Sequence, residues 1–391
     1  MNMSPMLRTM LGGSRRGENT SRRRLLTILA LVLLVATAGC TGALDDDDGE
    51  PGEAMEYVPE DTNMLIGFDF QMVAADEMND FISGMNDIFM EEFGEPFFAD
   101  DTDDLIDEFE SETGLDFAEA EHALIFGTMD DDPTVDDEVG IIFQSGWDHA
   151  DVAEAVAMDE PYDLELTEYH GEDVLYVPTD ESQFGEPTYI GVLPGDLIVI
   201  GDEDAVKAAL DVAYDDAPSA SGPMVDLHNS LTTGGITMAF DAEDVIDDDD
   251  IPDDPPQDQP LPPEVDPDLM EEIEAFGMAF YPGDGSFNFE MLAEATNEAD
   301  AEDLGDAFDG MLSLWAGMIE DEMGDQELAD EIRSIDVEVD GTTITASYSV
   351  IVDDLLDMVQ DFIWFIMGEF QAPMAIGAAI AVPATADAPV A

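Results

Sequence analysis

The sequence predicts an α+β fold in which antiparallel sheets are built from hairpins and carry helices packed on one face. Pairs of β-rich runs are separated by short turns, and amphipathic helical patterns follow the hairpins. The order hairpin, helix, hairpin, helix occurs at about 123–215 and again at about 273–367. This repetition predicts two similar halves, each made of two packed layers.

The first half covers residues 57–232. Strands are expected where β-branched and aromatic residues run together, at 64–70, 123–127, 139–143, 164–169, 174–177, 188–193 and 197–201. Helices are expected where apolar residues recur at helical spacing, at 81–89, 105–109, 148–158 and 204–214. Gly114 is expected to end the second of these helices.

The second half covers residues 233–370. Its strands are expected at 236–240, 273–281, 287–292, 335–339 and 343–350, and its helices at 304–319 and 355–366. A Pro/Asp-rich insertion, 247–268, has no apolar period and is expected to form a loop or linker.

Two segments flank these halves. Residues 40–56 are acidic and contain Gly and Pro, which is typical of a tether. Residues 371–391 are expected to form a flexible tail. Their uninterrupted apolar piece is only about ten residues, whereas a membrane span needs about 20.

The leader, residues 1–39, has the composition of an export signal. Arg22, Arg23 and Arg24 precede an apolar run at 25–36, which is too short to span a bilayer. Thr37-Ala38-Gly39 then leads directly to Cys40, the only cysteine in the sequence.

Residues 21–42 resemble the leaders of twin-arginine-exported lipoproteins from haloarchaea. Arg22 and Arg23 match the paired arginines of the export motif, and Thr-Ala-Gly-Cys matches the lipobox, although bacterial lipoboxes prefer Leu where Thr37 stands. The resemblance implies recognition by the twin-arginine translocase and a diacylglyceryl lipid on Cys40, which would become the first mature residue. The alternative is an ordinary signal peptide cut near Ala36 or Ala38.

The body of the chain resembles an uncharacterised family of exported bacterial and archaeal proteins. The similarity lies in residues 58–61 (Val-Pro-Glu-Asp), 112–117 (Glu-Thr-Gly-Leu-Asp-Phe) and 199–210. It implies an α+β fold with two internal repeats, and no activity, because the family has none assigned.

The charge of the chain is extreme. The sequence holds 8 lysine and arginine residues against 97 aspartate and glutamate residues. Only Lys207 and Arg333 among the bases follow the leader, and only Glu18 among the acids lies within it, so the chain from Cys40 onward carries about −94. A chain that is 45% hydrophobic can still build a core, so a halophilic surface explains this charge better than intrinsic disorder.

The same charge restricts the partners. A surface of about −94 repels phosphate backbones, which excludes nucleic acid. It also repels anionic headgroups, so attachment to the membrane is expected to come from the two acyl chains of the lipid.

No catalytic, cofactor or metal motif is found. G-x-S-x-G, P-loop and H-E-x-x-H patterns are missing from the sequence. His122 is expected at a strand start, His149 near a helix start, His170 in a hairpin turn and His228 in a polar loop, all as surface or capping residues. A zinc site assembled from distant residues stays an alternative, although no spacing suggests one.

Lys207 and Arg333 stand out because bases are so rare. One interpretation is that they anchor an anionic ligand. The other, which we favour, is that each forms a local charge pair: Lys207 with Asp211 on the same helix, and Arg333 near a helix C-terminus, where a cation is stabilised.

These observations predict a lipid-anchored protein on the outer face of the cell membrane, with a non-enzymatic interaction or cell-envelope role. The alternative is the solute-binding lipoprotein of an importer, which a cleft between two lobes would support. An extracellular hydrolase is the third hypothesis and has no supporting motif.

The charge predicts that the folded body depends on salt. The Debye length is about 3 Å at 1 M salt and about 10 Å at 0.1 M, so dialysis to low salt unmasks repulsion among the carboxylates. We expect the circular dichroism signal and the cooperative melting transition to be lost at about 0.1 M monovalent salt. Retention of both would contradict the halophilic interpretation.

Overall fold

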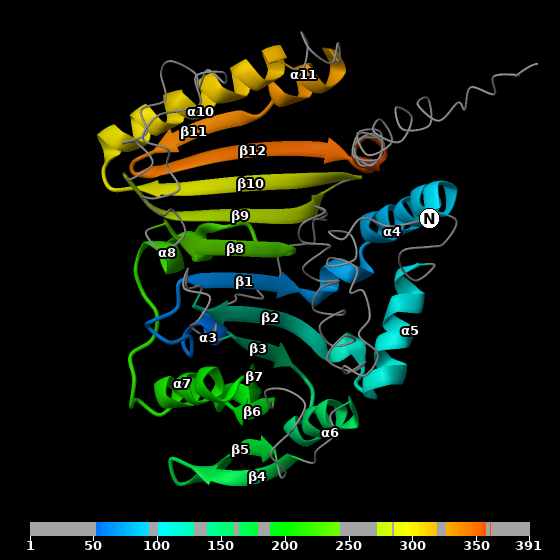
Figure 1. The fold of residues 1–391 in the computed structure, drawn as a ribbon, viewed down its shortest axis with the longest axis vertical. Helices are drawn as coiled ribbons and strands as arrows, with labels where there is room; N and C mark the ends of the chain where they lie inside the picture. The colour runs from blue at the N-terminus through cyan, green and yellow to red at the C-terminus, as the bar shows by residue number, and fades with distance from the viewer. Residues whose placement is uncertain are drawn as a thin grey trace, which may run out of the picture.

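One antiparallel sheet of twelve strands organises the protein (Figure 1). The computed structural model describes residues 52–93, 101–128, 139–159, 164–178, 188–242, 272–283, 285–318, 326–356 and 360. Within these residues the strand order across the sheet is β11-β12-β10-β9-β8-β1-β2-β3-β7-β6-β5-β4.

The strands confirm the predicted hairpins. Their bounds are β1 (Met64–Asp69), β2 (Ala120–Gly127), β3 (Val139–Ser145), β4 (Leu164–Tyr169), β5 (Glu172–Pro178), β6 (Tyr189–Val192), β7 (Ile198–Gly201), β8 (Ile236–Asp241), β9 (Ile273–Gly283), β10 (Ser286–Ala295), β11 (Asp336–Asp340) and β12 (Thr343–Ile351). The pairs β2–β3, β4–β5, β6–β7, β9–β10 and β11–β12 are all antiparallel and consecutive in the chain.

The helices begin and end largely where local signals predict. Their bounds are α3 (Gly52–Met55), α4 (Asp76–Phe93), α5 (Thr102–Thr113), α6 (His149–Asp159), α7 (Glu203–Ala213), α8 (Pro223–Ser230), α10 (Glu298–Met318) and α11 (Gln326–Ile332), with 3-10 turns η1 (Phe70–Ala74), η2 (Phe117–Glu119) and η3 (Pro194–Asp196). Gly114 ends α5 with a φ of 75°, as expected for a left-handed C-cap. The helices α3, α8 and α11 were not predicted.

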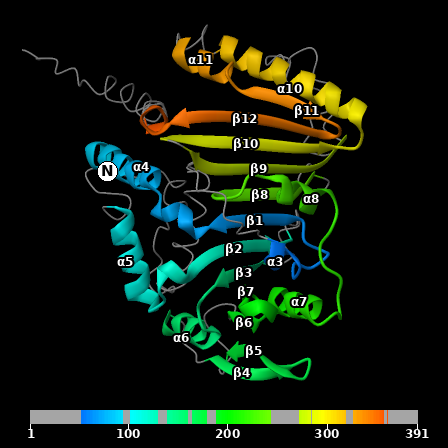
Figure 2. The same ribbon diagram turned by 180° about the vertical axis from the view of Figure 1, so that it is seen from behind.

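The helices cover both faces of the sheet, so the prediction that they pack on one face is wrong. Leu65 belongs to a core shared with α3, α7 and α8, whereas its neighbour Ile66 belongs to a core shared with η1 and α4. A third core packs α6 against Ile198. In both views α4, α5 and α6 gather on one side and α3, α7 and α8 on the other (Figures 1 and 2). Successive residues of a strand point to opposite faces of the sheet, so these strands are buried on both faces.

The two similar halves are not confirmed. Strands β1–β7 come from the predicted first half and β8–β12 from the second, but β1 and β8 are neighbours in a single sheet. The hairpins of both parts therefore extend one sheet in opposite directions from its centre (Figure 1).

The ordered body begins before the predicted boundary at residue 57. Residues 52–55 form α3, and Ala54 and Met55 are buried in a core. The last residues of the predicted tether are thus part of the fold. The rest of that tether, the leader, the insertion 247–268, the tail and most of the helix expected at 355–366 lie outside the described residues.

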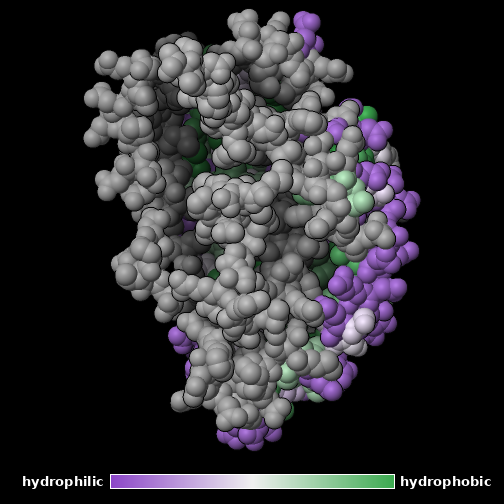
Figure 3. All heavy atoms as spheres, turned by 45° about the vertical axis from the view of Figure 1, so that its right-hand side comes forward, coloured by the Kyte–Doolittle hydropathy of each residue, from purple (hydrophilic) through white to green (hydrophobic). Residues whose placement is uncertain are grey.

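Among the acidic residues of the described chain, only Asp69 is buried. On the side seen in Figure 3, the described residues that reach the surface are mostly hydrophilic, with small apolar areas between them. Among the described helices, none combines the length and the apolar composition that crossing a membrane requires.

Phe287 provides a test of the second core. Its ring is fully buried and meets Phe81 of α4 edge to face, with 5.9 Å between ring centroids. We expect Phe287→Ala to lower the free energy of unfolding by about 3–5 kcal/mol, because it removes buried area and leaves a cavity. Urea titration in molar NaCl would measure this.

The matched control is Ile351→Ala on the neighbouring strand β12, since Ile351 is 51% exposed. Its effect should stay within about 0.5–1 kcal/mol. Equal losses in the two variants would contradict this account of the core.

Candidate functional site

A small, mostly apolar pocket with a few polar side chains, called the polar pocket below for those side chains, lies at the C-terminal end of the central strand β1. The register places Asp69 opposite His122 and His122 opposite Gln144, so these side chains share one face across β1, β2 and β3. On the other side of β1, Gly67 stands opposite Thr237 of β8. The pocket opens on the face that α3, α7 and α8 cover, and all five residues line it.

Asp69 is the acidic group of the pocket and is only 9% exposed. Its Oδ1 accepts a hydrogen bond of 2.8 Å from the backbone N–H of Gln71, where it caps η1. Its Oδ2 lies 4.0 Å from Nδ1 of His122, which is too far for a hydrogen bond. Burial raises the pKa of Asp69, while His122 and the Gln71 N–H act in the opposite direction.

Behind Thr237 lies a buried histidine. Nε2 of His228 is 3.1 Å from Oγ1 of Thr237, and His228 is 1% exposed. Burial lowers the pKa of His228 to about 4, so the ring is neutral at pH 7. Gly67 makes room for this pair, because a Cβ there would stand 2.3 Å from Oγ1 of Thr237.

The prediction that His228 lies in a polar loop is wrong. It belongs to α8, whose apolar residues Met224, Val225 and Leu227 join the core. Pro223 at the first helical position, followed by apolar residues at helical spacing, was the signal for this helix.

The pocket is small. Its volume is about 30 Å³, room for about two water molecules. Sites for organic ligands usually measure about 300–1,000 Å³. The pocket can therefore hold water or one small ion beside Asp69, and it has no room for an organic substrate.

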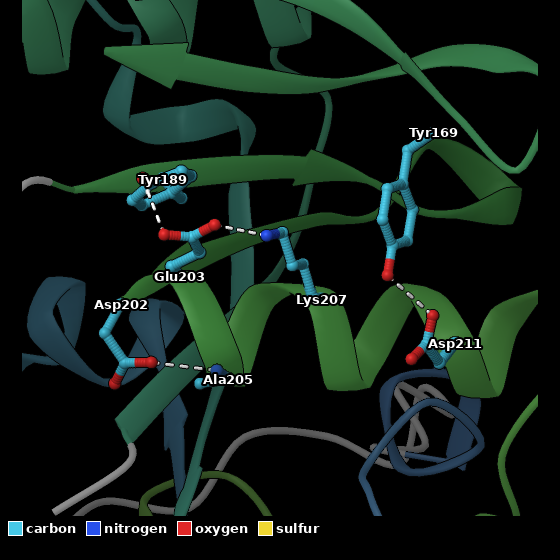
Figure 4. A network of polar contacts seen from close by, with 7 residues as sticks. All are labelled: Tyr169, Tyr189, Asp202, Glu203, Ala205, Lys207 and Asp211. Atoms are coloured by element: carbon cyan, nitrogen blue, oxygen red, sulfur yellow. Dashed lines mark hydrogen bonds and ion pairs between the residues drawn. The ribbon is translucent and has the colours of Figure 1, made fainter. Parts of the chain in front are cut away.

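Lys207 forms a local charge pair, although its partner differs from the predicted one. Its ammonium group contacts Oε1 of Glu203, and the hydroxyl of Tyr189 donates to the other carboxylate oxygen at 2.9 Å (Figure 4). The contact with Lys207, followed by that with Tyr189, lowers the pKa of Glu203. Asp211, the predicted partner, instead accepts a hydrogen bond of 2.8 Å from Tyr169.

Arg333 follows α11, near the helix C-terminus as predicted, and its Nη1 lies 2.9 Å from Oδ1 of Asp330. α7 packs beside β6 and β7, whereas α11 packs with α10 near the opposite edge of the sheet (Figure 1). The structure therefore does not bring Lys207 and Arg333 together in one site. Exposed pairs of this kind contribute about 0.2–1 kcal/mol each.

The remaining predicted site residues are Cys40, Arg22 and Arg23, which lie outside the described residues. His122 lies in β2, His149 opens α6, and His170 lies in the β4–β5 turn, as expected. His122, however, is half-buried and lines the pocket, so the expectation of a surface position is wrong for it. In the described part of the chain, no group of three or more His, Cys, Asp or Glu side chains is arranged to hold a metal ion.

Comparisons with known proteins add little. No protein-family model matches the chain, and no curated protein matches it. Among solved structures, crystal form III of TP0453 is similar over 78% of this chain and 97% of that chain, with 10% identity and a TM-score of 0.38. Crystal form IV of TP0453 gives 78% and 96% coverage, 9% identity and a TM-score of 0.37. Similarity at this level supports no inference about function.

His228 predicts a pH dependence of stability. Its pKa of about 4 in the folded state lies below the usual 6.5 of the unfolded chain, so acid favours unfolding. This contribution is complete above about pH 6.5 and is lost as the pH falls toward 4. Between pH 7 and 5 we expect wild type to lose roughly 2 kcal/mol relative to His228→Gln.

Urea titrations of both proteins in molar NaCl would measure this difference in the free energy of unfolding. The carboxylates are the same in both proteins, so their contribution to the pH dependence cancels in the difference. The control is His149→Gln, which changes a half-buried histidine at the start of α6 whose Nδ1 lies 2.8 Å from the hydroxyl of Tyr176. It should retain the wild-type pH dependence. If His228→Gln shows the same pH dependence of stability as wild type, the lowered pKa of His228 is not its cause.

Proposed function

We propose that this protein is a lipid-anchored extracytoplasmic surface protein that interacts with other components of the cell envelope and has no catalytic role. One observation carries the proposal: the single cysteine of the sequence, Cys40, directly follows the small residues that close an export leader. No other thiol competes for this chemistry.

The distance from Cys40 to the folded body fits an anchor. The described fold begins at Gly52 with α3, so the intervening chain spans at most about 40 Å when fully extended. Ala54 and Met55 are buried, which fastens the end of this connection to the sheet. A lipid on Cys40 would thus keep the α3 side of the body near the membrane.

In the described residues, the pocket beside Asp69 offers no site for an organic substrate. An enzyme needs a reacting group within reach of a bound substrate, but the space beside Asp69 admits only water or a small ion. The solute-binding alternative needs a larger pocket. Among the described residues, a second pocket of about 280 Å³ approaches that size, but four carboxylates line it, those of Asp76, Glu77, Asp80 and Asp353. The candidate anchors Lys207 and Arg333 do not line it and pair locally with Glu203 and Asp330. An interaction role through the outer surface is therefore the function we favour.

The test replaces the sulfur and follows the location of the protein. We expect Cys40→Ser to abolish the lipid mass on the first mature residue and to release the protein from the membrane fraction, since the two acyl chains are the attachment. Fractionation of cells and mass spectrometry of the N-terminal peptide measure both effects. The matched control, Thr41→Ser, retains the sulfur and should stay lipidated and membrane-bound.

Two outcomes contradict the proposal. If Cys40→Ser is processed and stays with the membrane as wild type does, lipid anchoring is wrong. If both anchored and released forms gain thermal stability from sugars, peptides or amino acids in molar salt, the importer alternative replaces the interaction role, because a ligand that binds only the folded state raises its stability.

A further inference from the structure

We propose that the polar pocket binds a monovalent alkali-metal cation, with the carboxylate of Asp69 as its charged ligand. The pocket measures about 30 Å³ and lies between β1, β2, β3 and the segment 233–237. An ion in so small a space lies close to each of the oxygens that line it. This inference is independent of the proposed lipid anchor.

Asp69 is a buried carboxylate without a direct counter-charge. It is 9% exposed, and its Oδ1 is occupied by the backbone N–H of Gln71. Its Oδ2 lies 4.0 Å from Nδ1 of His122, which is beyond hydrogen-bond distance. Among the described residues that line the pocket, His122 is the only other ionisable side chain. Because a buried charge is costly unless an opposite charge contacts it, Oδ2 favours a cation beside it.

Gln144 supplies a second oxygen. Its Nε2 donates a hydrogen bond of 2.9 Å to Oε2 of Glu121, and this contact fixes the orientation of the amide, since the reverse orientation would set Oε1 against a carboxylate. Oε1 is therefore the buried atom, and it has no hydrogen-bond partner among the described residues. A buried acceptor of this kind is costly unless a ligand contacts it.

Thr237 supplies a third oxygen. It is 6% exposed and lines the pocket, and its Oγ1 lies 3.1 Å from Nε2 of His228. A hydroxyl oxygen has two lone pairs, so at least one stays free whichever partner donates in this hydrogen bond. Carboxylate, amide and hydroxyl oxygens are typical ligands of hard cations, and water completes the coordination shell.

Charge and size select the class of ion. Sites for Ca²⁺ commonly contain several carboxylates, whereas Asp69 carries the only carboxylate among the described residues that line this pocket. One positive charge neutralises it. Water alone would contact the same oxygens but would leave the charge uncompensated. Room for about two water molecules admits an alkali-metal ion and excludes a bulky organic cation such as tetramethylammonium.

The exclusion by size provides the test. Urea titrations of the mature protein in about 2 M NaCl and in about 2 M tetramethylammonium chloride compare an ion that fits with one that does not, at equal screening. The pH is 8.5, because burial raises the pKa of Asp69 and a protonated carboxyl would not hold the cation. If the site has a dissociation constant of about 0.2 M, bound sodium lowers the equilibrium constant of unfolding about tenfold.

Asp69→Asn removes the charge and keeps the size of the side chain, which can still cap η1. We expect the ratio of the unfolding constants in the two salts to fall about tenfold in this variant. The matched control is Asp116→Asn. Asp116 caps the 3-10 turn η2 in the same way, accepting a hydrogen bond of 3.0 Å from the N–H of Ala118, and it does not line the pocket. This variant should keep the wild-type ratio, because general effects of the two salts are common to all three proteins.

Anomalous diffraction from wild-type crystals grown in RbCl locates the ion independently of the variants. We expect a rubidium peak beside Oδ2 of Asp69, in contact with the pocket oxygens. The proposal fails if the pocket holds no rubidium, since water alone then fills it. It also fails if Asp69→Asn keeps the wild-type ratio, or if Asp116→Asn loses it to the same extent, because the salt effect would then come from general charge density.

Discussion

Backbone pairing of β1 with both of its neighbours holds the described structure together. Met64 pairs with Gly127 of β2 on one side and with Phe240 of β8 on the other. Along the strand, Leu65 and Ile66 enter the cores on opposite faces. The hairpins made from early and late sequence are therefore joined through this strand, and the polar pocket stands at its end. A shift of one residue in its register would exchange both cores.

Local chemistry predicted most of the elements but not their assembly. Turn residues and apolar alternation located the hairpins, and Gly114 located the end of α5, because these signals act over a few residues. The order of twelve strands and the second helical layer depend on contacts between distant parts of the chain. One signal for two layers was present: residues 64–68 are continuously apolar apart from Gly67, which is typical of a strand buried on both faces.

The candidate site was harder to predict, because carboxylates are too numerous for their spacing to be informative. Because basic side chains are so few, many acidic side chains in the described structure accept hydrogen bonds from uncharged donors. Asp101 and Asp202 cap helices by accepting hydrogen bonds from backbone N–H groups, and Glu294 accepts hydrogen bonds from the hydroxyls of Thr342 and Thr343. Asp211 likewise accepts a hydrogen bond from Tyr169, while Lys207 pairs with Glu203 one turn earlier on the same helix. Such partners cannot be identified by charge in a sequence.

The position of β8 has a consequence for biosynthesis. During translation, the residues of β1 emerge from the ribosome long before residues 236–241, which form β8 and pair with one edge of β1. During that interval the strand presents unpaired amide and carbonyl groups, which invite association with other chains. Prematurely terminated chains that end before residue 236 would keep this strand edge unpaired. Chaperones and proteases should therefore act on them more often than on the complete chain.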